Sequence, residues 1–175
     1  MSDTIRIIEV VSYNSHWKEE YLSEKQKLLA ALHDQIVEIH HVGSTAIPDI
    51  YAKPVIDILV GVKSISAVDT YNDKMQELGY IAKGEFGIAG RRFFLKGQIN
   101  RTNHVHIFQV GNLHIARHIN FRDYMIAHPD DARRYEKLKQ ELAEKFRYDI
   151  DAYCEGKDAF IKEIDRKAEE WARAK

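Results

Sequence analysis

The alternation of apolar and polar positions predicts four β-strands in the first two thirds of the chain. Residues 36–42 are β-branched and roughly alternating, and they stop at Gly43 and Ser44, which predict a tight turn. Six of the eight residues in 55–62 are apolar, which predicts a buried strand. Residues 91–96 and 104–110 are separated by a polar turn and predict a hairpin.

Apolar residues at helical spacing predict the other elements. One helix is expected at about 15–33, a second from Ser64 or Ser66 to Gly79, and further helices from Leu113 onward with a break at His128 and Pro129. A short extended segment is expected near residues 5–11. We therefore predict an α+β fold in one structural domain. Residues 1–112 form a mixed sheet of four or five strands with flanking helices, and residues 113–175 form a C-terminal helical segment packed on it, with a cleft between the two parts.

The amino-acid composition excludes several classes of protein. The 175 residues include 26 Lys and Arg against 27 Asp and Glu, and 45% are hydrophobic, which is typical of a folded globular domain. A net charge of −1 argues against a protein that coats duplex nucleic acid or lipid. The chain has one cysteine and no apolar stretch long enough for a membrane span, and residues 1–11 lack the apolar core of a signal peptide. We expect a cytoplasmic protein without a membrane partner.

The turn after the first predicted strand is the main candidate for chemistry. A strand that ends in glycine and serine lets backbone N–H groups and a hydroxyl approach an anion closely, so Gly43, Ser44 and Thr45 are predicted to bind phosphate. Asp57 is a lone carboxylate in the next predicted strand. If the two strands are neighbours, this carboxylate lies beside the turn, an arrangement suited to holding Mg²⁺ against a nucleotide.

These motifs resemble those of the GrpB family along nearly the whole chain. The matching segments are His41-Val-Gly-Ser-Thr-Ala-Ile-Pro48, Ala52-Lys-Pro-Val-Ile-Asp57-Ile, Gly90-Arg-Arg-Phe-Phe94, His104-Val-His106, Phe121-Arg-Asp-Tyr124 with His128-Pro129, and Tyr135 with Leu138-Lys139. The GrpB family is in turn similar to the nucleotidyltransferase superfamily. That resemblance implies a polymerase-beta-like fold in which a Gly-Ser turn binds a triphosphate and carboxylates on nearby strands bind two metal ions.

The superfamily pattern is incomplete in this chain. It implies a second carboxylate two residues after Asp57, but that position is Leu59, on the same face of the strand. A leucine cannot replace an oxygen ligand of Mg²⁺. A single-metal site formed by Asp57, His104 and His106 is the remaining arrangement. This donor set favours Zn²⁺, Mn²⁺, Fe²⁺ or Ni²⁺ over Mg²⁺.

Further side chains are candidates for roles in the same cleft. His106 is the candidate general base beside Asp57, since imidazole titrates near neutral pH. Lys53 and either Arg91 or Arg92 are candidates for gripping phosphate oxygens. The alternative for the arginines is a surface ion pair, and for Lys53 a solvated side chain.

Three functions follow from these residues. The first is a nucleotidyltransferase-like protein that binds a nucleotide or phosphorylated small molecule and transfers a nucleotidyl group to a small acceptor with the help of Mg²⁺ or Mn²⁺. The second is a non-catalytic nucleotide- or coenzyme-binding module that lacks the second carboxylate. The third is a His/Asp transition-metal site, with Zn²⁺ as one candidate, that catalyses hydrolysis. The nucleotide, the acceptor, the metal and the oligomeric state do not follow from the sequence.

Overall fold

The computed structural model describes residues 5–175 and contains a five-stranded mixed sheet in the order β1-β2-β5-β4-β3. The strands are β1 (Ile36–Val42), β2 (Ile56–Val62), β3 (Tyr80–Ala82), β4 (Arg91–Lys96) and β5 (Asn103–Gln109). β2 and β5 are parallel, and the other neighbouring pairs are antiparallel. The predicted α+β class is confirmed, as is the hairpin of β4 and β5. The short edge strand β3 was not predicted from the sequence.

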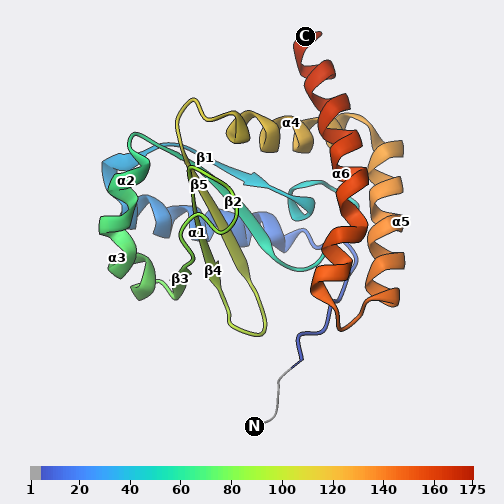
Figure 1. Cartoon of the computed structure of the whole chain (residues 1–175), viewed down its shortest axis with the longest axis horizontal. Helices are drawn as coiled ribbons and strands as arrows, with labels where there is room; N and C mark the ends of the chain where they lie inside the picture. Colours follow the sequence, from blue (N-terminus) through green and yellow to red (C-terminus); the bar gives the residue numbers. More distant parts are fainter. Residues whose placement is uncertain (1–4) are drawn as a thin grey trace.

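Helices surround this sheet (Figure 1). They are α1 (His16–Leu32), α2 (Ile65–Val68), α3 (Asn72–Glu77), α4 (Leu113–Ala127), α5 (Pro129–Lys145) and α6 (Ile150–Arg173). The predicted break before Pro129 is confirmed, because this proline opens α5, where its missing N–H costs nothing. Among the described helices, none is both long enough and apolar enough to cross a lipid bilayer.

One predicted helix differs from the structure. The single helix expected between residues 64 and 79 is divided into α2 and α3 by a 3₁₀ turn, Asp69–Tyr71. In this turn the Thr70 hydroxyl donates to the backbone oxygen of Ala67, a local bond that competes with helical pairing. In the segment near 5–11, Val11 forms an isolated bridge with Ala52 and the Ile8 N–H donates to the backbone oxygen of Arg147; residues 1–4 lie outside the described residues.

The two faces of the sheet have different partners. One face packs against α1, α2 and α3 in a large apolar core that includes Ile58, Val60 and Ile107. The other face packs against α4 through a smaller cluster, Val42, Leu59, Phe108 and Ile115. Because side chains alternate along a strand, Asp57, His104 and His106 share this second face with Leu59 and Phe108.

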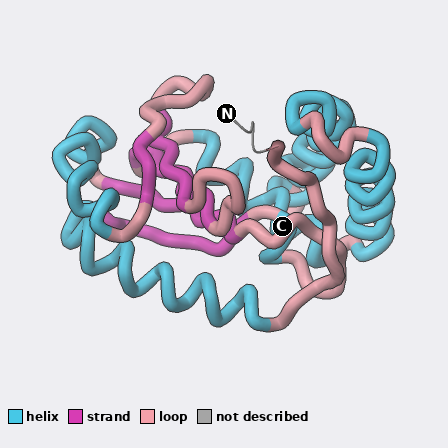
Figure 2. Tube along the Cα trace, turned by 90° about the horizontal axis from the view of Figure 1, so that it is seen from below, coloured by secondary structure: helices cyan, strands magenta, loops and turns pink. Residues whose placement is uncertain are grey.

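The C-terminal helices pack beside this second face. Figure 1 shows α5 and α6 running side by side next to the sheet, and Figure 2 shows helices set apart from the strands. The loop after β1 joins the two parts, because Ile47 and Ile50 are buried in a cluster with side chains of α4, α5 and α6. The end of the Gly43 turn is therefore held against the C-terminal helices.

Candidate functional site

A cavity of about 280 Å³ lies between the sheet and the helices α5 and α6. The lining residues come from the Gly43 turn, the loop before β2, β2, β5 and the two helices; they are Gly43, Ser44, Lys53, Val55, Asp57, His104, Tyr135, Lys139, Tyr153, Cys154 and Lys157. Five of the residues predicted to form a site, Gly43, Ser44, Lys53, Asp57 and His104, thus line one cavity. It lies between the core and the helical segment, where the sequence places the cleft.

The turn at Gly43 requires glycine for two reasons. Its backbone has a φ of 74°, which side chains disfavour, and a Cβ at this position would lie 2.6 Å from Oδ2 of Asp57. Val42 is paired with Asp57 in the antiparallel ladder of β1 and β2. The carboxylate therefore occupies the space that the missing side chain leaves, directly beside the turn.

Replacing Gly43 with alanine is expected to destabilise the fold by about 1–3 kcal/mol, because the new methyl group meets the carboxylate in a strained backbone conformation. The displaced Asp57 should also lose its contacts with the histidines. Chemical denaturation measures the first effect, and the imidazole NMR signals of His104 and His106 report the second. Gly84 has a φ of 61° and open space where a methyl group would lie, so it supplies a control for backbone strain alone. Equal losses in Gly43→Ala and Gly84→Ala would contradict the steric part of this explanation.

Two histidines of β5 hold the Asp57 carboxylate. His106 Nε2 lies 3.1 Å and His104 Nδ1 lies 3.4 Å from Oδ1 of Asp57. Burial opposes ionisation here, but the hydrogen bonds from His104 and His106 hold the pKa of Asp57 well below its usual range. Asp57 is therefore a carboxylate with one oxygen occupied by imidazoles and the other beside Gly43.

Arg91 fixes the tautomer of His106. Its Nη1 lies 3.3 Å from His106 Nδ1, and since a guanidinium can only donate, Nδ1 accepts and Nε2 carries the proton that points to Asp57. Both ring nitrogens are thus occupied, and His106 does not line the cavity. In this arrangement His106 orients Asp57, and it offers no lone pair to a metal ion or to a substrate proton.

The donor set does not fit the predicted three-ligand metal centre as it is arranged. Within residues 5–175, no group of three or more His, Cys, Asp and Glu side chains could hold a metal ion. Both imidazoles contact the same oxygen of Asp57, and the Nε2 of His106 is protonated. The metal site of Asp57, His104 and His106 stays a prediction, and it requires a different tautomer of His106.

Three lysines converge on the same cavity from the loop and the two helices. Lys53 and Lys157 lie 5.0 and 4.5 Å from the ring centroid of Tyr153, and Lys139 lies 4.5 Å from that of Tyr135. Burial and the neighbouring Lys157 lower the pKa of Lys53 to about 8 and that of Lys139 to about 7. These shifts show that the cations are crowded and poorly solvated.

The charge of these lysines is not balanced within the cavity. Among the described residues that line it, Asp57 is the only carboxylate, and its Oδ1 is taken by the histidines. Lys139 is 2% exposed and donates to the backbone oxygen of Tyr51 at 2.7 Å. A buried cation without a carboxylate partner is costly, so the cavity is suited to an anion.

Tyr153 adds an unused hydrogen-bonding group to the lining. Its side chain is 0% exposed, and within the described structure its hydroxyl has no hydrogen-bond partner. Burial raises the pKa of the Tyr135 hydroxyl to about 12, although Ser44 beside it opposes the shift. A neutral, buried tyrosine hydroxyl is a donor, and the unpaired one of Tyr153 is an indication of a missing acceptor.

Three of the residues predicted to bind phosphate are used elsewhere. Arg91 is buried, donates to His106 and to the backbone oxygens of Glu85 and Phe86, and does not line the cavity. Arg92 binds the carboxylate of Asp69 through Nε at 2.7 Å and Nη2 at 3.2 Å, because strand alternation turns it to the face opposite Arg91. The prediction for Arg92 is therefore corrected to the ion pair. Thr45 is 3% exposed, and its hydroxyl contacts His41 Nε2 at 2.9 Å and donates to the backbone oxygen of Val55. These contacts hold the turn in place, and Thr45 does not line the cavity.

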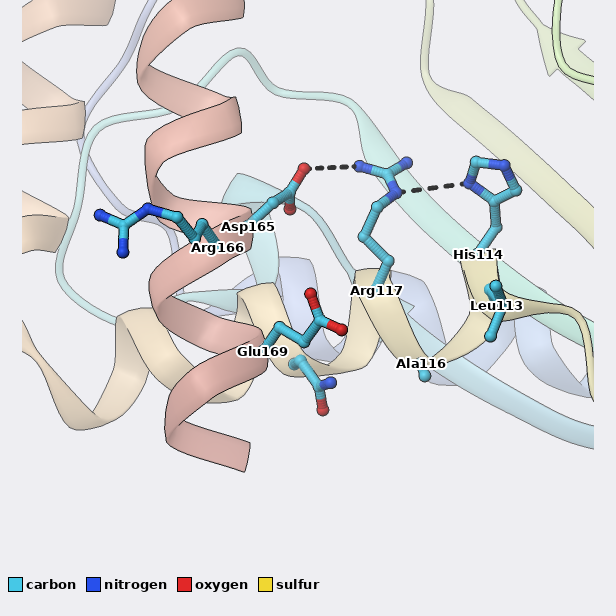
Figure 3. A pocket seen from close by; sticks show the side chains of 8 residues that line it. Leu113, His114, Ala116, Arg117, Asp165, Arg166 and Glu169 are labelled. Carbon is cyan, nitrogen blue, oxygen red and sulfur yellow. Dashed lines mark hydrogen bonds and ion pairs between the residues drawn. The ribbon is translucent and has the colours of Figure 1, made fainter. Parts of the chain in front are cut away.

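A separate cavity of about 520 Å³ lies between α4 and α6 (Figure 3). Arg117 bridges its two walls, donating to Asp165 at 3.2 Å and to His114 at 3.4 Å. None of the residues predicted to form a site lines this cavity. The ion pair of Arg117 and Asp165 joins the two helices here, and the cavity lies outside the candidate site.

Similarity to known proteins extends over this whole arrangement. The chain is 45% identical over 170 residues to the protein YqkA of Bacillus subtilis, covering 97% of this chain but only about half of YqkA. It is 36% identical to the glutamate-rich protein GrpB of Alkalihalophilus pseudofirmus, covering 89% of this chain and 92% of that protein. The crystal structure of conserved protein GrpB from Enterococcus faecalis superimposes with a TM-score of 0.89 at 42% identity, covering 91% and 96% of the two chains.

A weaker structural similarity concerns the nucleotidyltransferases. A structure of the Cid1 poly(U) polymerase aligns over 78% of this chain and 44% of its own, with a TM-score of 0.43 and 13% identity, which is too weak to assign a function. The family model of the GrpB protein, in contrast, matches residues 7–167. That match spans every strand of the sheet, the Gly43 turn and the cavity-lining helices, and it shows that the chain belongs to the GrpB family.

Proposed function

We propose that this protein binds a phosphorylated small molecule, with nucleotides as the first class to test, in the cavity between the Gly43 turn and the helices α5 and α6. The observation that carries the proposal is the convergence of Lys53, Lys139 and Lys157 on a cavity with one carboxylate. A phosphate group brings negative charge and several acceptor oxygens to the same point. It would therefore satisfy the lysines together, which a neutral ligand cannot do.

Two further features support an anion of this kind. The turn at Gly43 and Ser44 brings backbone N–H groups and a serine hydroxyl to the cavity wall, beside the Asp57 carboxylate that occupies the space of the missing Cβ. The unpaired hydroxyl of Tyr153 is a further donor, buried in the cavity wall. The cavity volume of about 280 Å³ is at the lower end of ligand-binding sites, so it suits the phosphate end of a nucleotide better than the whole molecule.

Nucleotidyl transfer is the second candidate, and the position of Asp57 beside the turn favours it. The carboxylate lies where a metal-bound phosphate would approach, and the histidines keep it ionised. Leu59 fills the position of the second carboxylate. Nucleotidyl transfer needs a second metal-binding carboxylate, which this position does not supply, whereas binding alone does not need it.

Calorimetric titration tests the binding proposal. The ligands are ATP, GTP, CTP, UTP and inorganic phosphate, each with EDTA and with Mg²⁺ or Mn²⁺. Lys139→Gln and Lys157→Gln should each weaken binding about tenfold, since one charge-assisted hydrogen bond contributes roughly 1.5–3 kcal/mol. The matched controls are Lys137→Gln on α5 and Lys162→Gln on α6, both exposed, which should change affinity less than about twofold.

The same titrations separate the two candidates. Metal-dependent affinity that collapses in Asp57→Asn supports nucleotidyl transfer, whereas affinity unchanged by EDTA and by this substitution supports a binding module. If none of the ligands binds at millimolar concentration, with or without metal, the proposal is wrong. Equal losses in the cavity variants and the exposed controls would also contradict it, because the effect would then be one of net charge.

A further inference from the structure

A second basic cavity adjoins the candidate site. It has a volume of about 430 Å³ and is lined by residues of the N-terminal segment, the Lys53 loop and the turn before β5: Arg6, Ile7, Ile8, Glu9, Lys53, Pro54, Val55, Ile99, Asn100, Arg101 and Thr102. Lys53 and Val55 line both cavities. The two hollows are therefore neighbours on either side of the Lys53 loop.

Arg101 is the distinctive residue of this second cavity. Its Nε and Nη1 atoms are buried, and within residues 5–175 neither has a hydrogen-bond partner. A guanidinium deprived of water without receiving acceptors is costly, and an arginine placed in this way is normally found beside a carboxylate or phosphate. Two of the three guanidinium nitrogens of this half-buried residue are thus shielded from water and lack an acceptor.

The charges around Arg101 do not supply that anion. Arg6 is close enough that burial and repulsion by Arg101 lower its pKa. Glu9 is the only carboxylate among the described residues that line the cavity, and it is an exposed residue. Two arginines and the shared Lys53 thus face a single, solvated acidic side chain.

We propose that the second cavity is a second phosphate subsite, so that the natural ligand is a small molecule with two or more phosphate groups that binds on both sides of Lys53. This inference rests on the proposed function of the first cavity and adds the class of ligand. The guanidinium of Arg101 grips one end of the ligand through paired N–H donors, whose fork matches phosphate oxygens. The lysines of the first cavity bind the other phosphate, and Lys53 lies between the two.

Inorganic phosphate and inorganic triphosphate are the probes, measured by calorimetry on the full chain. The readout is the ratio of the triphosphate affinity to the phosphate affinity. In Arg101→Gln this ratio should fall about tenfold, because one charge-assisted contact to the far phosphate is lost. The control is Arg173→Gln on α6, an exposed arginine that pairs with Glu169, and it should leave the ratio unchanged.

Thermal unfolding of the ligand-free variant gives an independent readout. Because Arg101→Gln removes two buried, unpaired N–H groups of a cation, the variant should be at least as stable as the wild type without ligand and should gain less from triphosphate. A ratio that does not change in Arg101→Gln overturns the second subsite. A variant that is less stable than the wild type without ligand also overturns it, since Arg101 would then be a structural residue.

Different results would contradict the two proposals. If Lys157→Gln weakens both probes and Arg101→Gln weakens neither, the first cavity binds phosphate and the second subsite is wrong. If Arg101→Gln weakens triphosphate and Lys157→Gln changes nothing, the second cavity binds anions and the proposed function of the first is wrong. If the wild type binds neither probe, both are wrong.

Discussion

Replacing Leu59 with aspartate is expected to unfold most of the protein, although it restores the carboxylate that the nucleotidyltransferase pattern implies. Leu59 is 0% exposed and packs with Val42, Phe108 and Ile115 between the sheet and α4. Loss of the leucine contacts alone costs about 2–5 kcal/mol, and burying a carboxylate without a partner costs several more. The sum is comparable to the whole stability of a typical domain, about 5–15 kcal/mol.

Urea denaturation monitored by far-UV circular dichroism measures this effect. Leu59→Met is the matched control, because it keeps the apolar contact and should cost less than about 1.5 kcal/mol. A Leu59→Asp variant that folds with near wild-type stability and binds Mg²⁺ would contradict the explanation. The expected result means that the position of the missing carboxylate is taken by a buried leucine that packs against α4. One substitution therefore cannot restore a two-carboxylate metal site.

The strands and their shared face could be predicted from the sequence because their signals are local. β-branched residues and the period of two place Asp57 and Leu59 on one side of β2 and His104 and His106 on one side of β5. The parallel register then sets Asp57 opposite His104 and Leu59 opposite His106. Sequence alone left open which of the two adjacent arginines faces this side, since that depends on the register of β4 against β5. The pairing of Arg91 with Phe108 decides it.

The lysines of the helices were not predicted as a group, because their convergence depends on how α5 and α6 pack against α4 and the loop after β1. Lys157 lies in a polar stretch of α6 that is typical of a solvated face. Lys139 did carry a signal, since it follows Tyr135 by four residues and precedes Leu142 by three, and so lies within the apolar stripe of α5. A cation at a core position of a helix is unusual enough to indicate a buried charge.

The buried Lys139 should make the stability of the ligand-free protein rise with pH above 7. Its pKa is about 7 in the folded protein, against about 10.4 in the unfolded chain. Between these values the unfolded chain binds the proton and the folded protein does not, so the free energy of unfolding increases with pH. One such group contributes up to roughly 1.4 kcal/mol per pH unit, and below pH 7 its full penalty is present.

Lys139→Met isolates this contribution. The methionine keeps an apolar side chain at the 2%-exposed position, so the variant should be more stable than the wild type near pH 6 and should lose this part of the pH dependence. The measurement is the difference in unfolding free energy between the two proteins from pH 6 to 9.5. Lys137→Met, an exposed neighbour on α5, is the control and should keep the wild-type slope. An unchanged slope in Lys139→Met would contradict the assignment.

The same titration connects the buried lysine to the proposed ligand. An anion beside Lys139 favours its charged form, so phosphate binding should raise the pKa of the lysine and take up a proton near pH 8. Calorimetry in two buffers with different ionisation enthalpies measures that uptake, which should fall in Lys139→Met to the part that belongs to Lys53, whose pKa is about 8, and should be unchanged in Lys137→Met. Phosphate binding without proton uptake would place the anion away from Lys139. Proton uptake through this residue would locate the phosphate between the Gly43 turn and α5. This is the position expected from the three lysines, whose charge has too few carboxylate partners in the cavity.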